Sequence, residues 1–426
     1  MTTTDTRIPV DIGKVLVDPA AYADHRLHDT YRWLRANNPL GVAEIEGFDP
    51  FWVVTRHADL QEVGRQNELF PYGNRSSTMV DQFGDARVRE IMGGSPQLLR
   101  TLVHMDAPDH PKYRALTQGW FMPASLRKLE DKIRGIARAA VDRLAGMGGR
   151  CDFVADFALG YPLHVVMEIL GVPEQDEPRM LKLTQEIFGP QDPDTARAAL
   201  SDPGAFVLSM MAVVEDFSAY FGAISADRRA NPRDDLASVI ANAQVDGEPI
   251  SDQAAMSYYI IVATAGHDTT SSSTAGGMWA LCENPDQWAK LKADPSLIPT
   301  FVDEAIRWTT PVKHFMRSAA ADTELAGRKI AQGDWLMLCY ASGNRDEAVF
   351  ENPYSFQVDR KPNKHIAFGY GAHLCLGQHL AKMEMRILFE ELLPRLKSVA
   401  FDGEPTMSQS WFVNGPKKLP LRFELA

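Results

Sequence analysis

The chain has 426 residues, of which 45% are apolar, so it can bury a large hydrophobic core. Its net charge of −12 argues against a nucleic-acid partner, because binding a phosphate backbone requires a basic face. No apolar run approaches the roughly 18 residues of a membrane span, and the polar N-terminus lacks the apolar segment of a signal peptide. We therefore expect a cytoplasmic protein with no membrane anchor.

Two short strands are predicted first, at residues 42–46 and 51–55, around the turn Gly47-Phe48-Asp49-Pro50. Residues 71–103 are rich in Gly, Ser and Pro, which predicts an irregular loop with a short helix. Residues 188–206 hold three breaker pairs that contain proline. They are predicted to form a mobile connection between two helices, of the kind that serves as a lid. Most of the remaining chain is predicted to be helical, and no repeat or long linker divides it.

One long helix is predicted from about Ser251 to Glu283. Ser251 is a suitable N-cap, and Asn284-Pro285 ends the helix. At ~1.5 Å per residue its length is about 48 Å, so it should pass through the core. The middle of this helix is unusual, because Ala263 to Thr270 contains Gly, Thr and Asp, which are poor residues for a helix interior.

The strongest chemical signal of the sequence is Cys375. The other cysteines are Cys151, Cys282 and Cys339, and no C-x-x-C pair indicates a disulfide framework or a zinc ribbon. Cys375 lies among glycines and precedes an amphipathic helix, so backbone N–H groups and the positive helix end should favour its thiolate. Taken alone, the pattern also fits a buried structural cysteine in a glycine-rich turn.

The spacing around Cys375 favours the first interpretation. The run Phe368-Gly369-x-Gly371-x-His373-x-Cys375-x-Gly377 resembles the signature of the cytochrome P450 superfamily, and the resemblance extends from about residue 20 to the end. It implies the superfamily's fold over residues 1–426: a single, mainly α-helical domain with a smaller β-rich region near the N-terminus. It also implies a b-type haem (iron protoporphyrin IX) between the long helix and the cysteine loop, with Cys375 as the ligand to the iron. The residues expected to contact the haem ring are Ala265, Gly266, Phe368 and Gly369.

A second part of the resemblance involves Glu304 and Arg307. Their spacing puts a carboxylate and a guanidinium on one helical face. Alone, this pattern is usually a surface ion pair of little energetic value. In the superfamily such a pair joins a later arginine, matched here by Arg360, and braces the cysteine loop. The resemblance implies that all three residues are structural.

The segment Ala265-Gly266-His267-Asp268-Thr269-Thr270 resembles the superfamily's oxygen-activation motif. Thr269 can donate a hydrogen bond to the carbonyl of Ala265 and loosen the helix at Gly266, which would open a groove for dioxygen and water. The resemblance implies that Asp268 and Thr269 are catalytic and relay protons to the reacting oxygen. His267 differs from the apolar residue common in the family. It either tunes the relay or neutralises the charge of Asp268, and we favour the second.

Four basic residues match positions that hold the haem propionates in the superfamily: His110, Arg114, Arg317 and His373. His110 and Arg114 are four residues apart and share one helix face. Guanidinium and imidazole groups suit the recognition of carboxylates. Individually, each of the four also fits an ordinary solvated surface charge.

The resemblance implies a monooxygenase that hydroxylates an unactivated C–H bond with O2. Electrons are expected from a 2Fe-2S ferredoxin and its reductase, because the chain has no fused redox module. Lys112, Lys382 and Arg386 are candidates for docking an acidic ferredoxin, and the protein is expected to be a monomer. Two alternatives stay open: a non-catalytic haem-thiolate sensor, and a peroxide-driven or isomerising haem enzyme. The intact Asp268-Thr269 pair argues against both.

The substrate is expected to be small and hydrophobic. Three stretches resemble those of bacterial superfamily members that oxidise α-terpineol, which indicates a monoterpenoid, with an aromatic or alicyclic hydrocarbon as the alternative. Besides the 71–103 loop and Ala265, the predicted substrate contacts are Ala263, the segment from Val312 to Phe315, and the C-terminal loop Trp411-Phe412-Val413.

Overall fold

The computed structural model describes residues 6–24, 26–196 and 203–426. Helices make up 53% of the structure, which agrees with the predicted mainly α class. The α-helices are Val10–Val15 (α1), Arg26–Asn37 (α2), His57–Arg65 (α3), Gln82–Ile91 (α4), Asp109–Gln118 (α5), Pro123–Leu126 (α6), Glu130–Ala145 (α7), Gly160–Leu170 (α8), Glu177–Phe188 (α9), Pro203–Ala230 (α10), Leu236–Ala241 (α11), Asp252–Ala265 (α12), Asp268–Glu283 (α13), Pro285–Ala293 (α14), Ile298–Thr309 (α15), Tyr340–Gly343 (α16) and Gln378–Arg395 (α17).

The strands are short and form several small sheets. They are Leu40–Ala43 (β1), Phe51–Val54 (β2), Arg150–Asp152 (β3), Gln244–Val245 (β4), Glu248–Pro249 (β5), His314–Ser318 (β6), Thr323–Leu325 (β7), Arg328–Ile330 (β8), Trp335–Cys339 (β9), Leu396–Phe401 (β10), Thr406–Met407 (β11), Pro416–Lys418 (β12) and Pro420–Leu425 (β13). Within the described residues, the largest sheet has four strands in the order β1-β2-β9-β6, and a three-stranded sheet has the order β10-β13-β3.

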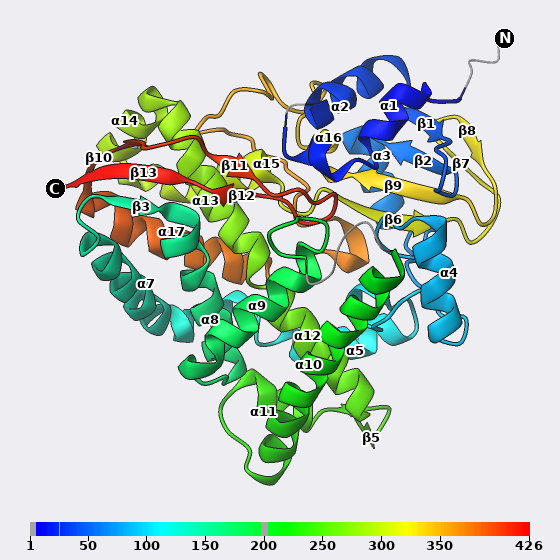
Figure 1. Cartoon of the computed structure of the whole chain (residues 1–426), viewed down its shortest axis with the longest axis horizontal. Coiled ribbons are helices and arrows are strands. Elements are labelled where there is room, and N and C mark those ends of the chain that lie inside the picture. The colour runs from blue at the N-terminus through cyan, green and yellow to red at the C-terminus, as the bar shows by residue number, and fades with distance from the viewer. Residues whose placement is uncertain (1–5, 25, 197–202) are drawn as a thin grey trace.

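The β-rich region and the helical region occupy opposite sides of the molecule. The sheet β1-β2-β9-β6 lies with α1, α2 and α3 at the upper right of Figure 1, while the long helices fill the left and lower parts. The main hydrophobic core belongs to the helical part and includes Phe217, Tyr259 and Phe301, each with 0% exposure. Two smaller cores lie around the four-stranded sheet. The predicted β-rich region near the N-terminus is confirmed, and later strands β6 and β9 complete it.

The early loops agree with the prediction in their main features. The first strand is Leu40–Ala43 rather than 42–46, and the second is Phe51–Val54. The 71–103 stretch is irregular and contains α4 and the start of a 3-10 turn at Leu102–His104. The connection predicted at 188–206 does join two helices, but it is shorter, because α9 ends at Phe188 and α10 begins at Pro203, and 197–202 lie outside the described residues. The lid function of this connection stays a prediction.

The long helix predicted from 251 to 283 is two helices. Ser251 caps the first, because its side chain accepts a hydrogen bond from Ala254 N–H at 3.2 Å, and Asn284 ends the second. Between them, Gly266 and His267 interrupt the helix. The prediction of one continuous helix was wrong at the point where the sequence carries poor helix-forming residues.

One helix in the described part of the chain is long and apolar enough, by length and composition, to cross a membrane, although we expected none. It spans Val207–Ala230, within α10. This is weak evidence, because a core helix passes the same test. Val213, Phe217 and Phe221 of this helix are fully buried in the main core, while 22% of its most apolar window is buried overall.

Candidate active site

The loop before Cys375 is held in place by its glycines. Gly369 and Gly371 have φ of +75° and +77°, a conformation that favours glycine. A Cβ on Gly371 would lie 1.9 Å from the carbonyl oxygen of Gly64, so the loop packs directly on the end of α3. The N–H of Cys375 donates to the carbonyl of Phe368 at 2.9 Å. The cysteine is therefore fixed by backbone contacts on both sides of the turn.

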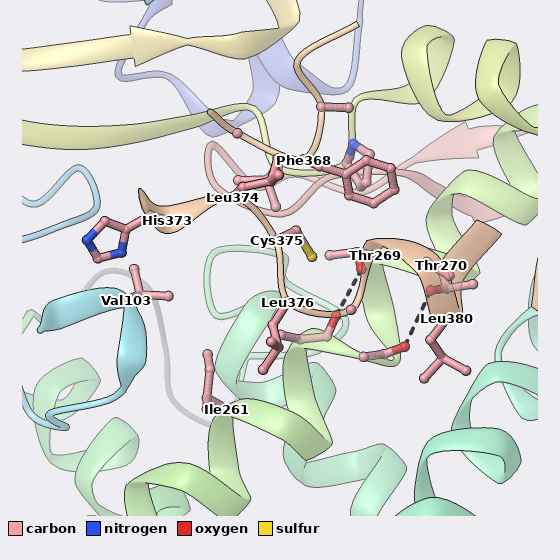
Figure 2. A pocket seen from close by; sticks show the side chains of 18 of the residues that line it. Val103, Ile261, Thr269, Thr270, Phe368, His373, Leu374, Cys375, Leu376 and Leu380 are labelled. Atoms are coloured by element: carbon pink, nitrogen blue, oxygen red, sulfur yellow. Dashed lines mark hydrogen bonds between the residues drawn. The ribbon is translucent and has the colours of Figure 1, made fainter. Parts of the chain in front are cut away.

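The sulfur of Cys375 points into a cavity, as Figure 2 shows. Burial raises the pKa of the Cys375 thiol, while the N–H groups of Gly377 and Gln378 and the charge of Arg114 lower it by less. The expected thiolate-favouring effect of the helix start is present, but desolvation outweighs it. Coordination of a metal cation would supply the charge stabilisation that a thiolate needs here.

The four predicted anion-binding residues lie together beside this loop. The rings of His110 and His373 are 4.0 Å apart between centroids, and Arg114 Nη2 donates to the carbonyl of Leu374 at 2.8 Å. Arg317 donates to the carbonyl of Phe70 at 2.6 Å, and its guanidinium stacks on the ring of Tyr72 at 3.6 Å.

This basic cluster contains buried nitrogen atoms that have no hydrogen-bond partner among the described residues. Burial, followed by the charge of Arg317, lowers the pKa of His373 strongly, so its ring is neutral at ordinary pH. Within the described residues, His373 Nε2 and Arg317 Nε are buried without a hydrogen-bond partner. The nearby carboxylate of Asp106 accepts from the N–H groups of Tyr72 and Gly73 at 3.0 and 2.7 Å. The cluster therefore suits an additional anionic ligand.

The break between α12 and α13 has the predicted hydrogen bond. Thr269 Oγ1 donates to the carbonyl of Ala265 at 2.9 Å, and Thr270 Oγ1 donates to that of Gly266 at 3.4 Å. A Cβ on Gly266 would lie 2.9 Å from Val166 of α8, so only a glycine allows the two helices to approach this closely. The side-chain hydroxyls thus replace regular helical bonding at the point where the helix faces Cys375.

His267 is buried and contacts the carboxylate of Asp268. Its Nδ1 lies 3.2 Å from Asp268 Oδ1 and 3.3 Å from Thr184 Oγ1, and its Nε2 donates to the carbonyl of Leu159 at 3.0 Å. The other carboxylate oxygen, Oδ2, is buried with no partner among the described residues. This geometry favours the charge-neutralising role that we preferred for His267.

Two cavities adjoin each other and share part of their lining. The first, the Cys375 cavity, has a volume of about 240 Å³ and includes the cysteine loop and the cationic cluster. The second, the large cavity, has a volume of about 570 Å³ and lies between the 76–104 segment, α9, α10, α12 and the C-terminal loop. Residues that line both cavities form what we call the rim: Val103, Ile261, Ala265, Thr269, Val312 and Phe315.

Most predicted substrate contacts line the large cavity, but Ala263 does not. Val312, Phe315, Trp411 and Phe412 are all among its lining residues. Ala263 has 0% exposure and belongs to the main core, so its prediction as a substrate contact was wrong. The face of α12 that carries Ile260, Ile261, Thr264 and Ala265 lines the cavity instead, because Ala263 points to the other side of the helix.

Asp268 lines neither cavity, whereas Thr269 lines both. Thr269 is thus the member of the predicted pair that faces Cys375. The carboxylate of Asp268 is one residue away, with 12% of its side chain exposed.

Glu304, Arg307 and Arg360 form a fully buried network. Arg307 donates to both carboxylate oxygens of Glu304 at 2.7 and 2.8 Å, and Arg360 donates to them at 3.1 and 3.0 Å. Arg307 also donates to the carbonyl of Asn344 at 2.9 Å, and the Asn344 side chain accepts from Ile366 N–H at 2.7 Å. The network therefore reaches the start of the cysteine loop, as expected, and is not a surface ion pair.

The three predicted docking cations are already paired within the chain. Lys112 contacts Asp246 at 2.5 Å, and Lys382 contacts Asp303 at 2.8 Å. Arg386 contacts Glu130 at 2.9 Å and Glu390 at 2.7 Å. These carboxylates reduce the positive potential that the sequence alone suggested.

Comparison with known proteins agrees with this geometry. A family model described as cytochrome P450 matches residues 93–423. The chain belongs to the cytochrome P450 family. It is 50% identical to cytochrome P450-terp from a Pseudomonas species, over 98% of this chain and 99% of that protein. The solved structure of CYP108D1 from Novosphingobium aromaticivorans superposes with a TM-score of 0.91 at 47% identity, covering 99% of this chain and 100% of that one.

A second solved structure is that of CYP268A2 from Mycobacterium marinum, in complex with pseudoionone. It superposes with a TM-score of 0.87 at 32% identity and covers 99% of this chain and 100% of that one. At these identities and coverages this P450 is a monooxygenase, which uses a small substrate, O2 and a redox partner.

The cofactor of this P450 is haem b, and the residues of the Cys375 cavity fit it. The Cys375 cavity, between α12, α13 and the cysteine loop, is lined by the four predicted ring contacts Ala265, Gly266, Phe368 and Gly369. Cys375 would bind the iron. The unpaired nitrogen atoms of His373 and Arg317, with His110 and Arg114, would hold the two propionates.

Some residues around this site were not predicted. Tyr72 supports Arg317 by stacking, and Asn344 links the buried network to the cysteine loop. Glu384 of α17 lines the Cys375 cavity as a buried carboxyl group. Tyr72 and Asn344 lie in segments without a periodic pattern, so the sequence carries no signal for them. Glu384 falls on the buried face of a predicted helix, where an isolated acidic residue is itself unusual.

Replacing Arg307 by alanine should prevent stable haem incorporation. The change leaves Glu304 buried with one guanidinium fewer, at a cost of about 3–5 kcal/mol. Haem content per protein and the denaturant midpoint of unfolding measure the effect. Arg395→Ala is the matched control, because Arg395 forms an exposed pair with Asp142 at 2.7 Å and its removal should cost only about 0–1 kcal/mol. A normal haem content in Arg307→Ala would contradict the bracing role.

Glu384→Gln should make the protein more stable at neutral pH. Burial raises the pKa of Glu384 well above 4.5, so the folded state retains a proton that the unfolded chain releases. The contribution of Glu384 to the free energy of unfolding is therefore fully present below about pH 4.5. It is lost as the pH rises toward the folded-state pKa, by up to about 1.4 kcal/mol per pH unit. In the native protein, the unfolding midpoint should decrease from pH 5 to pH 7 and again to pH 8. In the variant, the midpoint should change less over the same range. Glu404→Gln, at an exposed position, should leave the native slope unchanged.

Proposed function

We propose that this P450 hydroxylates a small hydrophobic terpenoid. The observation that carries the proposal is the large cavity, whose mainly apolar lining joins the Cys375 cavity through the rim. Its volume of about 570 Å³ suits a small ligand. The likeness to cytochrome P450-terp and to a P450 that binds pseudoionone supports a terpenoid rather than an aromatic or alicyclic hydrocarbon.

Different residues of the chain have different roles in this reaction. Haem b, held by Cys375, would supply the activation of dioxygen for the overall reaction, in which one oxygen atom enters a C–H bond and the other leaves as water at the cost of two electrons and two protons. The rim residues Val312 and Phe315 orient the substrate and exclude water. Thr269 Oγ1 accepts a hydrogen bond or passes a proton at the cavity surface, and the buried Asp268 Oδ2, which has no partner among the described residues, would relay protons to it.

We further propose that the protein works as a cytoplasmic monomer and receives its electrons from a 2Fe-2S ferredoxin. Lys112 and Lys382 keep 39% and 38% of their side chains exposed although each is paired, so both remain able to contact an acidic partner. Arg386 is less exposed, at 26%, and belongs to a network with Glu130 and Glu390.

The rate of reduction by a ferredoxin should fall as salt concentration rises. Attraction between exposed charges is screened over about 8–10 Å at ordinary ionic strength. Lys112→Glu and Lys382→Glu should each slow reduction at low salt, in stopped-flow measurements with one chosen ferredoxin. Lys329→Glu, in the β7–β8 hairpin, is the control, because it makes the same charge change in the β-rich region. Salt-independent reduction would contradict this docking surface.

The experiment that tests the proposed function is a titration of the purified holoprotein with a panel of terpenoids and hydrocarbons. The change in haem absorbance gives the affinity, and product analysis with a reconstituted redox chain gives the reaction. We expect small terpenoids to bind most tightly and to be hydroxylated. Preferential oxidation of aromatic hydrocarbons would overturn the substrate class, and binding without any product would favour a sensor.

A further inference from the structure

His104 occupies a fixed position at the edge of the large cavity. It ends the 3-10 turn Leu102–His104, whose N-cap residue is Thr101. The N–H of Thr101 donates to His104 Nδ1 at 3.2 Å, and Thr101 Oγ1 lies 3.0 Å from the same nitrogen. A backbone N–H can only donate, so Nδ1 carries no proton in this arrangement. The neutral ring therefore has its proton on Nε2.

The environment of His104 keeps the ring neutral and leaves Nε2 free. Burial lowers the pKa of His104 to about 4, so it is uncharged at ordinary pH. The residue is only half-buried by surface exposure although it lies deep in the protein, because it lines the large cavity. In the described part of the chain, its Nε2 has no hydrogen-bond partner, while Nδ1 is fully used by Thr101.

Other polar side chains that line the same cavity are mostly engaged with the protein. Thr264 donates to the carbonyl of Ile260 at 2.8 Å, and Gln97 donates to that of Arg75 at 2.9 Å. Ser410 bridges the carbonyl of Phe188 and the N–H of Phe412. The Nε2–H of His104 is thus a rigid donor in a mostly apolar space, which is the arrangement that fixes the orientation of a ligand with one polar group.

We propose that His104 Nε2–H donates a hydrogen bond to an oxygen atom of the substrate, which makes the substrate a terpenoid alcohol or ketone rather than a pure hydrocarbon. This inference rests on the proposed function and narrows its substrate class. Val103, the neighbour of His104, belongs to the rim, so a ligand held at His104 extends toward the Cys375 cavity. His104 is a positioning residue: it selects which carbon reaches the rim.

Two substitutions at position 104 separate the donor from the turn. In His104→Asn the shorter amide can still accept from Thr101 N–H, but its N–H₂ group does not reach as far as Nε2. In His104→Gln a donor is restored near the position of Nε2. Each holoprotein is titrated with a terpenoid alcohol, the corresponding ketone and the hydrocarbon that lacks the oxygen, and the products are identified.

We expect native protein to bind the alcohol and the ketone more tightly than the hydrocarbon. His104→Asn should lose about 3- to 10-fold in affinity for the two oxygenated ligands, the range of one neutral hydrogen bond. Its affinity for the hydrocarbon should not change, its product mixture should broaden, and His104→Gln should recover part of the preference.

Three results would overturn the inference. They are equal affinity of native protein for oxygenated and hydrocarbon ligands, an equal loss for all ligands in His104→Asn, and an unchanged product mixture in that variant. If hydrocarbons are oxidised as well as alcohols, the inference fails while the proposed hydroxylation stands. If no terpenoid of the panel is oxidised, the proposed function itself fails.

Discussion

Replacing Cys375 by histidine should abolish the strongly red-shifted Soret band of the reduced carbonyl complex. That band requires a thiolate ligand, and Cys375 is the cysteine whose sulfur faces the Cys375 cavity. Imidazole is a neutral ligand and does not push electron density onto the iron as a thiolate does. Absorbance spectra of the reduced protein with and without carbon monoxide measure the change.

A matched control for this experiment is Cys282→Ala. Cys282 is half-buried on α13 and lines neither cavity, and burial raises its thiol pKa to about 12, so it has no tendency to form a thiolate. The control variant should keep the native band. Retention of the band in Cys375→His, or its absence from the native protein, would contradict the assignment of the ligand.

Thr269→Ala should uncouple electron consumption from product formation. The hydroxyl does not ligate the metal, so haem content and the carbonyl spectrum should stay native. Without it, protons are delivered less selectively at the cavity surface, and the electrons consumed should appear as peroxide or excess water. Product formed per NADH consumed measures the coupling, and Thr269→Ser, which keeps the hydroxyl, should preserve it.

Asp268→Asn should lower the turnover number more than it lowers the amount of product formed per NADH consumed. The amide retains a hydrogen-bonding group beside His267 but cannot supply a proton, and general acid catalysis typically contributes about 10²–10⁴-fold. The turnover number with the best substrate of the panel measures this loss. Full coupling in Thr269→Ala together with an undiminished rate in Asp268→Asn would exclude the proposed relay.

Features encoded by short motifs could be predicted from the sequence. The turn before Cys375 needs its glycines, the pair Glu304 and Arg307 is one helical turn apart, and Thr269 bonds to a carbonyl four residues earlier. Each depends on residues close in sequence. The family resemblance added Arg360 and the propionate residues, which come from distant segments.

Features that depend on contacts between distant segments could not be predicted. The partners of Lys112 and Lys382 are carboxylates of remote segments, at positions 246 and 303. Ala263 and Ile261 are equally apolar, and only the packing of α12 decides that Ala263 is in the core and Ile261 at the rim. His104 lies one residue outside the loop predicted to contact the substrate, and its ring is directed by a local cap with Thr101.

The two-cavity arrangement separates binding from turnover. The rim is the lining that the large cavity, which would admit a ligand, shares with the Cys375 cavity, which would hold the haem. A compound too bulky to fit against Val312 and Phe315 can fill the large cavity tightly without bringing a carbon to the rim. Such a compound should act as a competitive inhibitor, and removing bulk at the rim, by Phe315→Ala for example, should convert it into a substrate. Affinity rankings of a compound library will therefore diverge from turnover rankings as ligand width increases.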